Sequence, residues 1–153
     1  MIEKLNYKNK LDVYNFVISN NDSCQDFYIT FDKERHFLND LKLVDKVLRT
    51  QQCYGLFEKE LEAVMIVYRS EGFRPYVKLF AKKQSQYNKL LKFLNWHHNE
   101  ELFVKVKKYN PAVYELKRNR FFVEGFRGKE ILLKKLKDTR ERPHGTNQFL
   151  FKD

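Results

Sequence analysis

The chain has 153 residues, of which 42% are hydrophobic and 33% charged, and this balance excludes a disordered chain and fits one domain of ordinary size. Its net charge is +10, and the stretch from Lys105 to Arg142 holds thirteen Lys and Arg against five Asp and Glu. A basic last third suits a polyanion such as nucleic acid, although a solvated lysine-rich face has the same composition.

The first third of the chain predicts one strand and two helices. Residues 2–7 form the strand, residues 9–18 the first helix and residues 33–49 the second. Two sets of apolar residues recur at helical spacing and predict the buried faces of these helices. They are Leu11, Tyr14 and Ile18 in the first helix, and Phe37, Leu41, Val44 and Leu48 in the second.

The middle of the chain predicts three strands and a helix. Residues 53–57 and 61–68 form a hairpin, and residues 76–81 form the next strand. The run 61–68 is nearly all apolar, which is typical of a central strand covered on both faces. The helix follows at 85–96, and its predicted buried side consists of Tyr87, Leu90, Leu91 and Leu94.

The last part predicts a strand, a helix and a hairpin. The strand 102–107 alternates Leu102, Val104 and Val106 with Phe103, Lys105 and Lys107, so one face is expected to be wet. A helix follows at 110–119, and strands 121–126 and 129–136 form a hairpin, with Phe122 predicted in the core.

This order of elements predicts an α+β fold in α/β/α layers. The sheet is mixed, largely antiparallel, with six to seven strands and about four flanking helices. Residues 1–138 form one predicted domain. Periodicity stops at Thr139, so residues 139–153 form an extended tail that ends in the apolar run Phe149-Leu150-Phe151. We expect this run either to fold back on the domain or to dock on another chain.

The residues alone bear on three questions: the redox compartment, a membrane span and a metal site. Cys24 and Cys53 form no disulfide framework, which indicates a reducing compartment such as the cytoplasm. No apolar run is long enough to span a bilayer. The adjacent His97 and His98 would point about a hundred degrees apart on a helix, with no further ligand at suitable spacing, so no metal site is predicted.

The segment 110–116, Asn-Pro-Ala-Val-Tyr-Glu-Leu, is followed by Phe122 and Glu124-Gly125-Phe126. Together with the order of elements, this segment resembles the GNAT superfamily of N-acetyltransferases over residues 52–137. The resemblance implies that fold, acetyl-CoA as cofactor and transfer of an acetyl group to an amine. In that family a loop of the type Arg/Gln-x-x-Gly-x-Gly/Ala opens a helix, and its backbone N–H groups bind the CoA pyrophosphate.

The corresponding loop here contains no glycine. Lys82 falls where the family has Arg or Gln, and Ser85 and Tyr87 fall where it has small residues. The resemblance implies that Lys82, Lys83, Ser85 and Asn110 bind the cofactor. The residues themselves leave other roles open, because Ser85 and Asn110 also suit helix caps and the Tyr87 ring should block close approach of a diphosphate.

The family's catalytic groups are matched less well. Many members use a Tyr on the late helix as the acid, and the matching position here is Lys117, with Tyr114 nearly one turn away. Members often use a Glu near the central strands as the base. Glu60, Glu62 and Glu71 are available, and Glu62 and Tyr114 are the candidates that we carry forward.

Two functions therefore follow from the resemblance. One is an acetyl-CoA-dependent N-acetyltransferase with a divergent cofactor loop. The other is a catalytically inactive GNAT-fold protein that binds or assembles through its basic surface and apolar tail. A phage virion component would be an example, in which case the location would be the virion.

Overall fold

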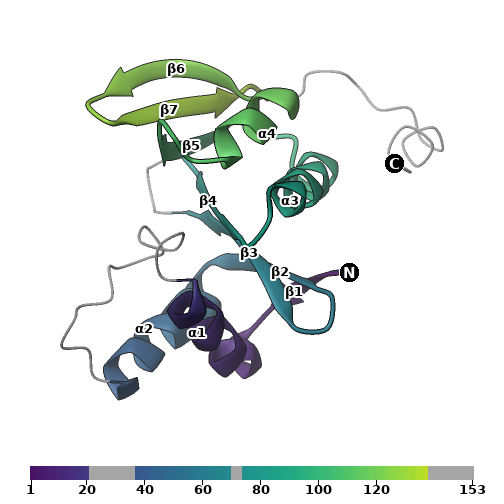
Figure 1. The fold of residues 1–153 in the computed structure, drawn as a ribbon, viewed down its shortest axis with the longest axis vertical. Coiled ribbons are helices and arrows are strands. Elements are labelled where there is room, and N and C mark those ends of the chain that lie inside the picture. The colour runs from purple at the N-terminus through teal and green to yellow at the C-terminus, as the bar shows by residue number, and fades with distance from the viewer. Residues whose placement is uncertain (21–36, 70–73, 138–153) are drawn as a thin grey trace.

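Seven strands form one sheet in the order β1-β2-β3-β4-β5-β7-β6 (Figure 1). This computed structural model describes residues 1–20, 37–69 and 74–137. The strands are β1 (Ile2–Leu5), β2 (Gln52–Phe57), β3 (Leu61–Tyr68), β4 (Tyr76–Ala81), β5 (Leu102–Lys107), β6 (Phe122–Arg127) and β7 (Glu130–Lys135). The helices are the 3-10 helix η1 (Tyr7–Asn9), α1 (Lys10–Ser19), α2 (Phe37–Thr50), α3 (Gln84–His97) and α4 (Ala112–Arg118).

The predicted fold class is confirmed. Every pair of neighbouring strands is antiparallel except β4 and β5, which are parallel. The helices α1 and α2 cover one face of the sheet over β1 to β4, whereas α3 and α4 cover the other face (Figure 1). The start of the second predicted helix, residues 33–36, and the predicted tail lie outside the described residues.

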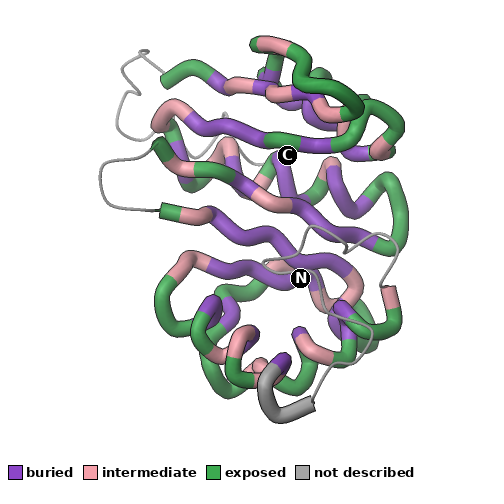
Figure 2. Tube along the Cα trace, turned by 90° about the vertical axis from the view of Figure 1, so that its left-hand side faces the viewer, coloured by how far each residue is buried: buried purple, intermediate pink, exposed green. Residues whose placement is uncertain are grey.

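The strand β3 separates two cores. Ala63, Met65 and Val67 pack under α3 and α4, and Val64 and Ile66 pack under α1 and α2. All five are at most 1% exposed, which confirms the prediction of a strand covered on both faces. Figure 2 shows the same arrangement, with buried stretches concentrated in the central strands.

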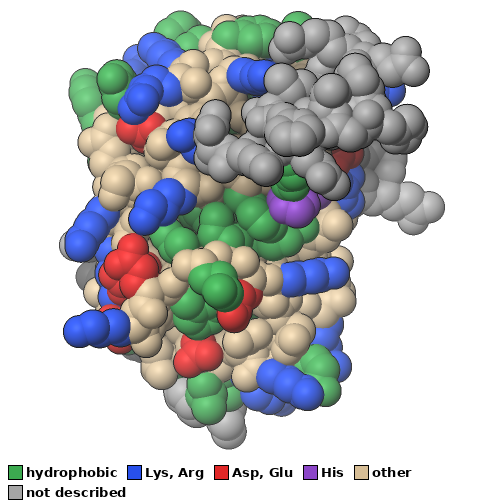
Figure 3. Space-filling view, turned by 90° about the vertical axis from the view of Figure 1, so that its right-hand side faces the viewer, with side chains coloured by type: hydrophobic (Ala, Val, Ile, Leu, Met, Phe, Trp, Pro, Cys, Tyr) green, Lys and Arg blue, Asp and Glu red, His purple; other side chains and the backbone are tan. Residues whose placement is uncertain are grey.

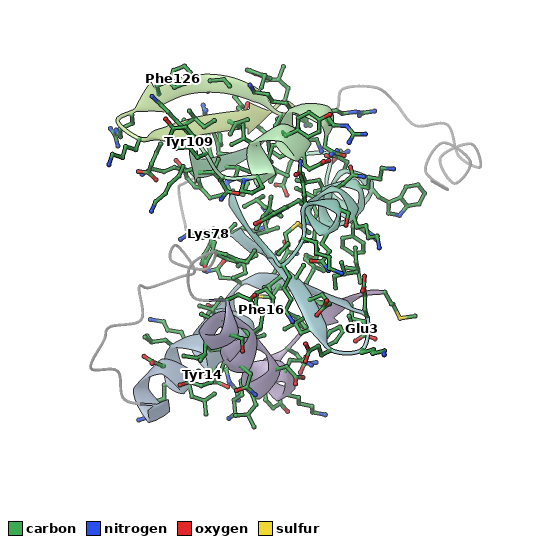
Figure 4. All side chains as sticks on the ribbon, in the orientation of Figure 1. Glu3, Tyr14, Phe16, Lys78, Tyr109 and Phe126 are labelled. Atoms are coloured by element: carbon green, nitrogen blue, oxygen red, sulfur yellow. The ribbon has the colours of Figure 1, made fainter. Side chains whose placement is uncertain are left out.

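The buried face of α1 differs from the prediction. Leu11 and Ile18 are exposed, and the residues that contact the sheet and α2 are Val13, Phe16 and Val17. Figure 4 labels Phe16 on α1, close to the sheet. The helix carries apolar residues around most of its circumference, so spacing alone does not select which of its faces is buried.

Phe122 is not in the core, contrary to the prediction. It is 42% exposed on the edge strand β6, whereas Phe121 is 3% exposed. The turn after α4 explains the shift by one residue. Arg120 has a φ of 75°, and the Phe121 backbone N–H donates to the Leu116 carbonyl. This left-handed turn brings Phe121 under α4 and leaves Phe122 as the first residue of the strand.

Phe121→Ala should lower the free energy of unfolding by about 3–5 kcal/mol, because it removes a buried ring and leaves a cavity. Phe122→Ala is the matched control and should cost clearly less, because Phe122 is 42% exposed on an edge strand and its loss leaves no enclosed cavity. Chemical denaturation of both variants measures the difference. Equal losses at the two positions would contradict the described packing.

Candidate functional site where β4 and β5 diverge

The sheet opens between β4 and β5. These parallel strands share one residue pair, Tyr76 with Phe103, and the Phe103 backbone N–H donates to the Pro75 carbonyl at 3.1 Å. By contrast, β4 has six pairs with β3 and β5 has six pairs with β7. The two strands therefore diverge toward their carboxyl ends, Ala81 and Lys107. The backbone of β4 beyond Tyr76 has no register partner on β5, so its edge can pair with a ligand.

The helix α3 begins immediately beyond the open end of β4, and its first turn is capped from within. The Lys83 backbone N–H donates to Oε1 of Gln86 at 2.9 Å. Gln86 is 1% exposed, and its Nε2 makes no hydrogen bond. A backbone donor at the start of the helix, where an anion would bind, is thus already occupied.

Ser85 does not cap α3, contrary to one of its two predicted roles. The helix begins at Gln84, so Ser85 lies inside the first turn, where it is exposed. Tyr87 is also placed differently from the expectation that its ring obstructs the loop. The ring is buried with Leu90, Leu91 and Leu94 against the sheet. The side chain that accepts from the backbone N–H of Lys83 in this loop is that of Gln86.

Lys82 is held by two carboxylates. Its Nζ lies 2.9 Å from Oε1 of Glu60 and 2.9 Å from Oε2 of Glu62. The hydrogen bonds that Lys82 donates to Glu60 and Glu62 raise the pKa of Lys82, and the hydrogen bond that Glu62 accepts from Lys82 lowers the pKa of Glu62. Glu62 is consequently a carboxylate at neutral pH, but its partner also makes it a weaker base.

A β-bulge explains how Glu62 reaches this position. The register passes from the pair Leu56–Ala63 to the pair Phe57–Leu61, so Glu62 is the extra residue on β3. A bulge redirects a side chain that regular alternation would place elsewhere. Nearby, Lys89 lies 3.8 Å from Glu58. Lys82 and Lys89 therefore pair with the three glutamates 58, 60 and 62. With the neighbouring Lys83 the formal charge of this group is zero.

The opposite wall is formed by the residues after β5. The Asn110 backbone N–H closes a turn on the Lys107 carbonyl, and Asn110 Oδ1 accepts a hydrogen bond from the Ala112 N–H at 2.9 Å. Asn110 thus caps α4, the role that the residues alone had left open beside cofactor binding. Tyr114 is 59% exposed with the Arg118 guanidinium over its ring, and Lys117 is exposed as well. Neither side chain is on the buried face of α4.

The structure therefore gathers Lys82, Lys83, Ser85 and Glu62 around the first turn of α3. Asn110 and Tyr114 lie on the separate wall at α4. Sequence reasoning missed Gln86, although Gln at the third position of a helix is part of the capping-box signature and could have indicated it. It could not have paired Lys82 with Glu62, because that contact depends on the register of β3 and β4.

Cys53 is not a candidate nucleophile. It is buried on β2, and burial raises the pKa of its thiol to about 12, so the thiolate is absent at neutral pH. Cys24 and Glu71 lie outside the described residues.

His98 is buried at the carboxyl end of α3. Its Nε2 lies 3.5 Å from the Tyr54 hydroxyl and its Nδ1 lies 3.3 Å from Oε1 of Glu100. Arg69 donates two hydrogen bonds to the Glu100 carboxylate, and Lys135 Nζ donates to the His98 carbonyl at 2.8 Å. Within residues 1–20, 37–69 and 74–137, no group of His, Cys, Asp and Glu is placed to hold a metal ion.

Stability should fall as the pH drops below about 6.5, the pKa of an unperturbed histidine. Burial lowers the pKa of His98 more than Glu100 raises it, so the unfolded chain takes up a proton that the folded chain does not. One such proton changes the free energy of unfolding by at most about 1.4 kcal/mol per pH unit.

Denaturation between pH 5.5 and 7.5 measures this slope. His98→Gln should flatten it, whereas His97→Gln should flatten it much less, because the charge of His97 is the smallest of the causes that shift the pKa of His98. The same slope in the wild type and in His98→Gln would show that His98 titrates alike in the folded and unfolded chains.

No family model matches this sequence, and no curated protein matches it. Solved structures do match its fold. An N-acetyltransferase from Staphylococcus aureus Mu50 matches with a TM-score of 0.67 and 16% identity, over 88% of this chain and 96% of that chain. The GNAT domain of S. lividans PAT matches with a TM-score of 0.64 and 9% identity, over 87% and 88% of the two chains.

A third match is the ribosomal-protein-S5-alanine acetyltransferase from Vibrio fischeri, with a TM-score of 0.59 and 10% identity, over 92% of this chain and 94% of that chain. At these identities the likeness concerns the fold. No helix of the part of the chain that the structure describes has the length and apolar character needed to cross a membrane.

Proposed function

We propose that this chain, which has the GNAT fold, is an acetyl-CoA-dependent N-acetyltransferase that binds its cofactor between β4 and β5. The observation that carries the proposal is the divergence of these two strands after a single residue pair. A cleft floored by unpaired strand backbone suits a narrow, amide-containing chain such as the CoA arm, which can pair with it as another strand would. Acetyl-CoA would supply the acetyl group as an activated thioester, and CoA would leave as a thiolate that takes its proton from water.

The residues of the site fit the arm of the cofactor better than they fit its phosphates. The arm would meet the open edge of β4, where backbone N–H groups beyond Tyr76 would polarise the thioester carbonyl. The phosphates would lie at the first turn of α3, near Lys82, Lys83 and Ser85, with Asn110 on the facing wall. At that end the Gln86 amide must leave the Lys83 N–H before a phosphate oxygen can accept from it.

We assign Glu62 as the group that accepts the proton of the amine. It is ionised at neutral pH and lies on the same side of the cleft as α3, held in place by Lys82. A carboxylate with a lowered pKa is a modest base, so its contribution would be to orient the amine and to receive its proton through water. Tyr114 projects from the exposed side of α4, and we assign it no proton transfer.

The contacts in the first turn of α3 favour a second function. Gln86 occupies a backbone donor, and Lys82 is neutralised by Glu60 and Glu62, so the position for the diphosphate carries no net attraction. These contacts would suit a GNAT-fold protein that binds or assembles without catalysis. The two functions differ in whether the protein takes up acetyl-CoA.

Calorimetric titration with acetyl-CoA tests the proposal. The wild type should bind, and Gln86→Ala should bind about fivefold more tightly, because it releases the Lys83 N–H for a phosphate at the worth of about one hydrogen bond. Gln84→Ala is the matched control, since it removes an exposed glutamine from the same turn without freeing a donor. Thermal melting checks that all three proteins are folded.

No heat at millimolar acetyl-CoA, with either the wild type or Gln86→Ala, would exclude cofactor binding and leave the non-catalytic function. Binding to the wild type that Gln86→Ala weakens would contradict the assigned position of the diphosphate while leaving the cleft in place.

A further inference from the structure

A large groove lies on the α3 side of the molecule, away from the β4–β5 cleft. It has a volume of about 1000 Å³ and runs between the outer side of α3 and the β1–β2 edge of the sheet. Figure 3 shows hydrophobic side chains gathered in a hollow on this face, with Lys and Arg side chains around it. The apolar part is lined by Ile2, Leu56, Phe93 and Trp96, and the rim carries Lys89 and Lys92.

The lining of this groove is continuous with the core. Leu56 is buried, and Ile2 and Phe93 are partly buried and pack against the core beneath α3. The β1 end of the sheet is also an edge, because β1 pairs only with β2 in the described sheet. An apolar surface of this size on one domain usually has an occupant, since leaving it in water is unfavourable.

The described chain leaves the fold beside this groove. The last strand ends at Lys135, whose Nζ donates to the His98 carbonyl at the end of α3. Trp96 lines the groove and precedes His98 by two residues. The chain therefore passes the carboxyl end of α3 at the point where the groove begins.

The chain beyond this point is long enough to reach along the groove. Phe149 lies twelve positions beyond Lys137, and over that length the extended chain spans up to about 40 Å. The lining of the groove on α3 runs from Asn88 to Trp96, which is about 12 Å along a helix. The segment is therefore long enough to reach the groove without strain. The entropic cost of closing such a loop is also modest, because it grows only slowly with loop length.

We propose that Phe149, Leu150 and Phe151 of the same chain fill this groove. Each large apolar side chain that leaves water stabilises the contact by about 1.5–3 kcal/mol, which makes exposure of three in succession costly. The neighbouring Asp153 brings a carboxylate toward Lys92 on the rim, where Lys89 is already paired with Glu58. This contact differs from the proposed catalysis, because the groove contains neither Glu62 nor the open edge of β4, although Glu58 and Lys89 line it.

Trp96 reports on the groove directly, because it is the only tryptophan of the chain. In the full-length protein, replacing Phe149, Leu150 and Phe151 together with Ser should shift Trp96 emission to longer wavelength and raise its acrylamide quenching constant about twofold. Replacing Asn147 and Gln148 with Ser is the matched control and should change neither. A peptide of residues 146–153 added to the triple variant should reverse both changes.

Far-ultraviolet circular dichroism shows whether the triple variant is folded, and Leu150→Ser alone should give a smaller shift in the same direction. Identical emission and quenching in wild type and both variants would overturn the proposal. It would also be overturned if the wild-type emission changed on dilution together with its size-exclusion volume, since the segment would then occupy the groove of a second copy.

Discussion

The pairing of β4 with β5 is the contact on which the site depends. A parallel pair normally continues for several residues, but here it stops after Tyr76 and Phe103. The rest of each strand is held from its other side, by β3 on one side and β7 on the other. Each half of the sheet is therefore stable without the pairs that are missing between them, and a cleft can remain open at low cost.

The first turn of α3 is where two arrangements compete. In one, the chain satisfies its own helix start through Gln86 and neutralises Lys82 through Glu60 and Glu62. In the other, a diphosphate accepts from the same backbone and from the lysines around it. The buried amide of Gln86 is stable where it is, but its Nε2 makes no hydrogen bond, so moving it costs less than moving a fully bonded group would.

The sequence predicted the strands and helices best where one residue pattern allowed a single interpretation. The apolar run of β3 and the stripe Tyr87, Leu90, Leu91 and Leu94 of α3 lie as expected. Two predictions failed because the pattern was ambiguous by one position. In α1 most of the circumference is apolar, and at Phe121 and Phe122 two equal rings adjoin a turn whose left-handed residue could not be foreseen.

The site was less predictable than the fold, because its contacts depend on register. Lys82 meets Glu62 through a bulge in β3, and His98 meets Tyr54 across 44 positions of sequence. The most direct measurement is amide chemical-shift mapping while acetyl-CoA is added to the labelled protein. The account predicts shifts in Val77 to Ala81 and in Lys83 to Ser85. Shifts confined to other strands, or none at millimolar cofactor, would contradict it.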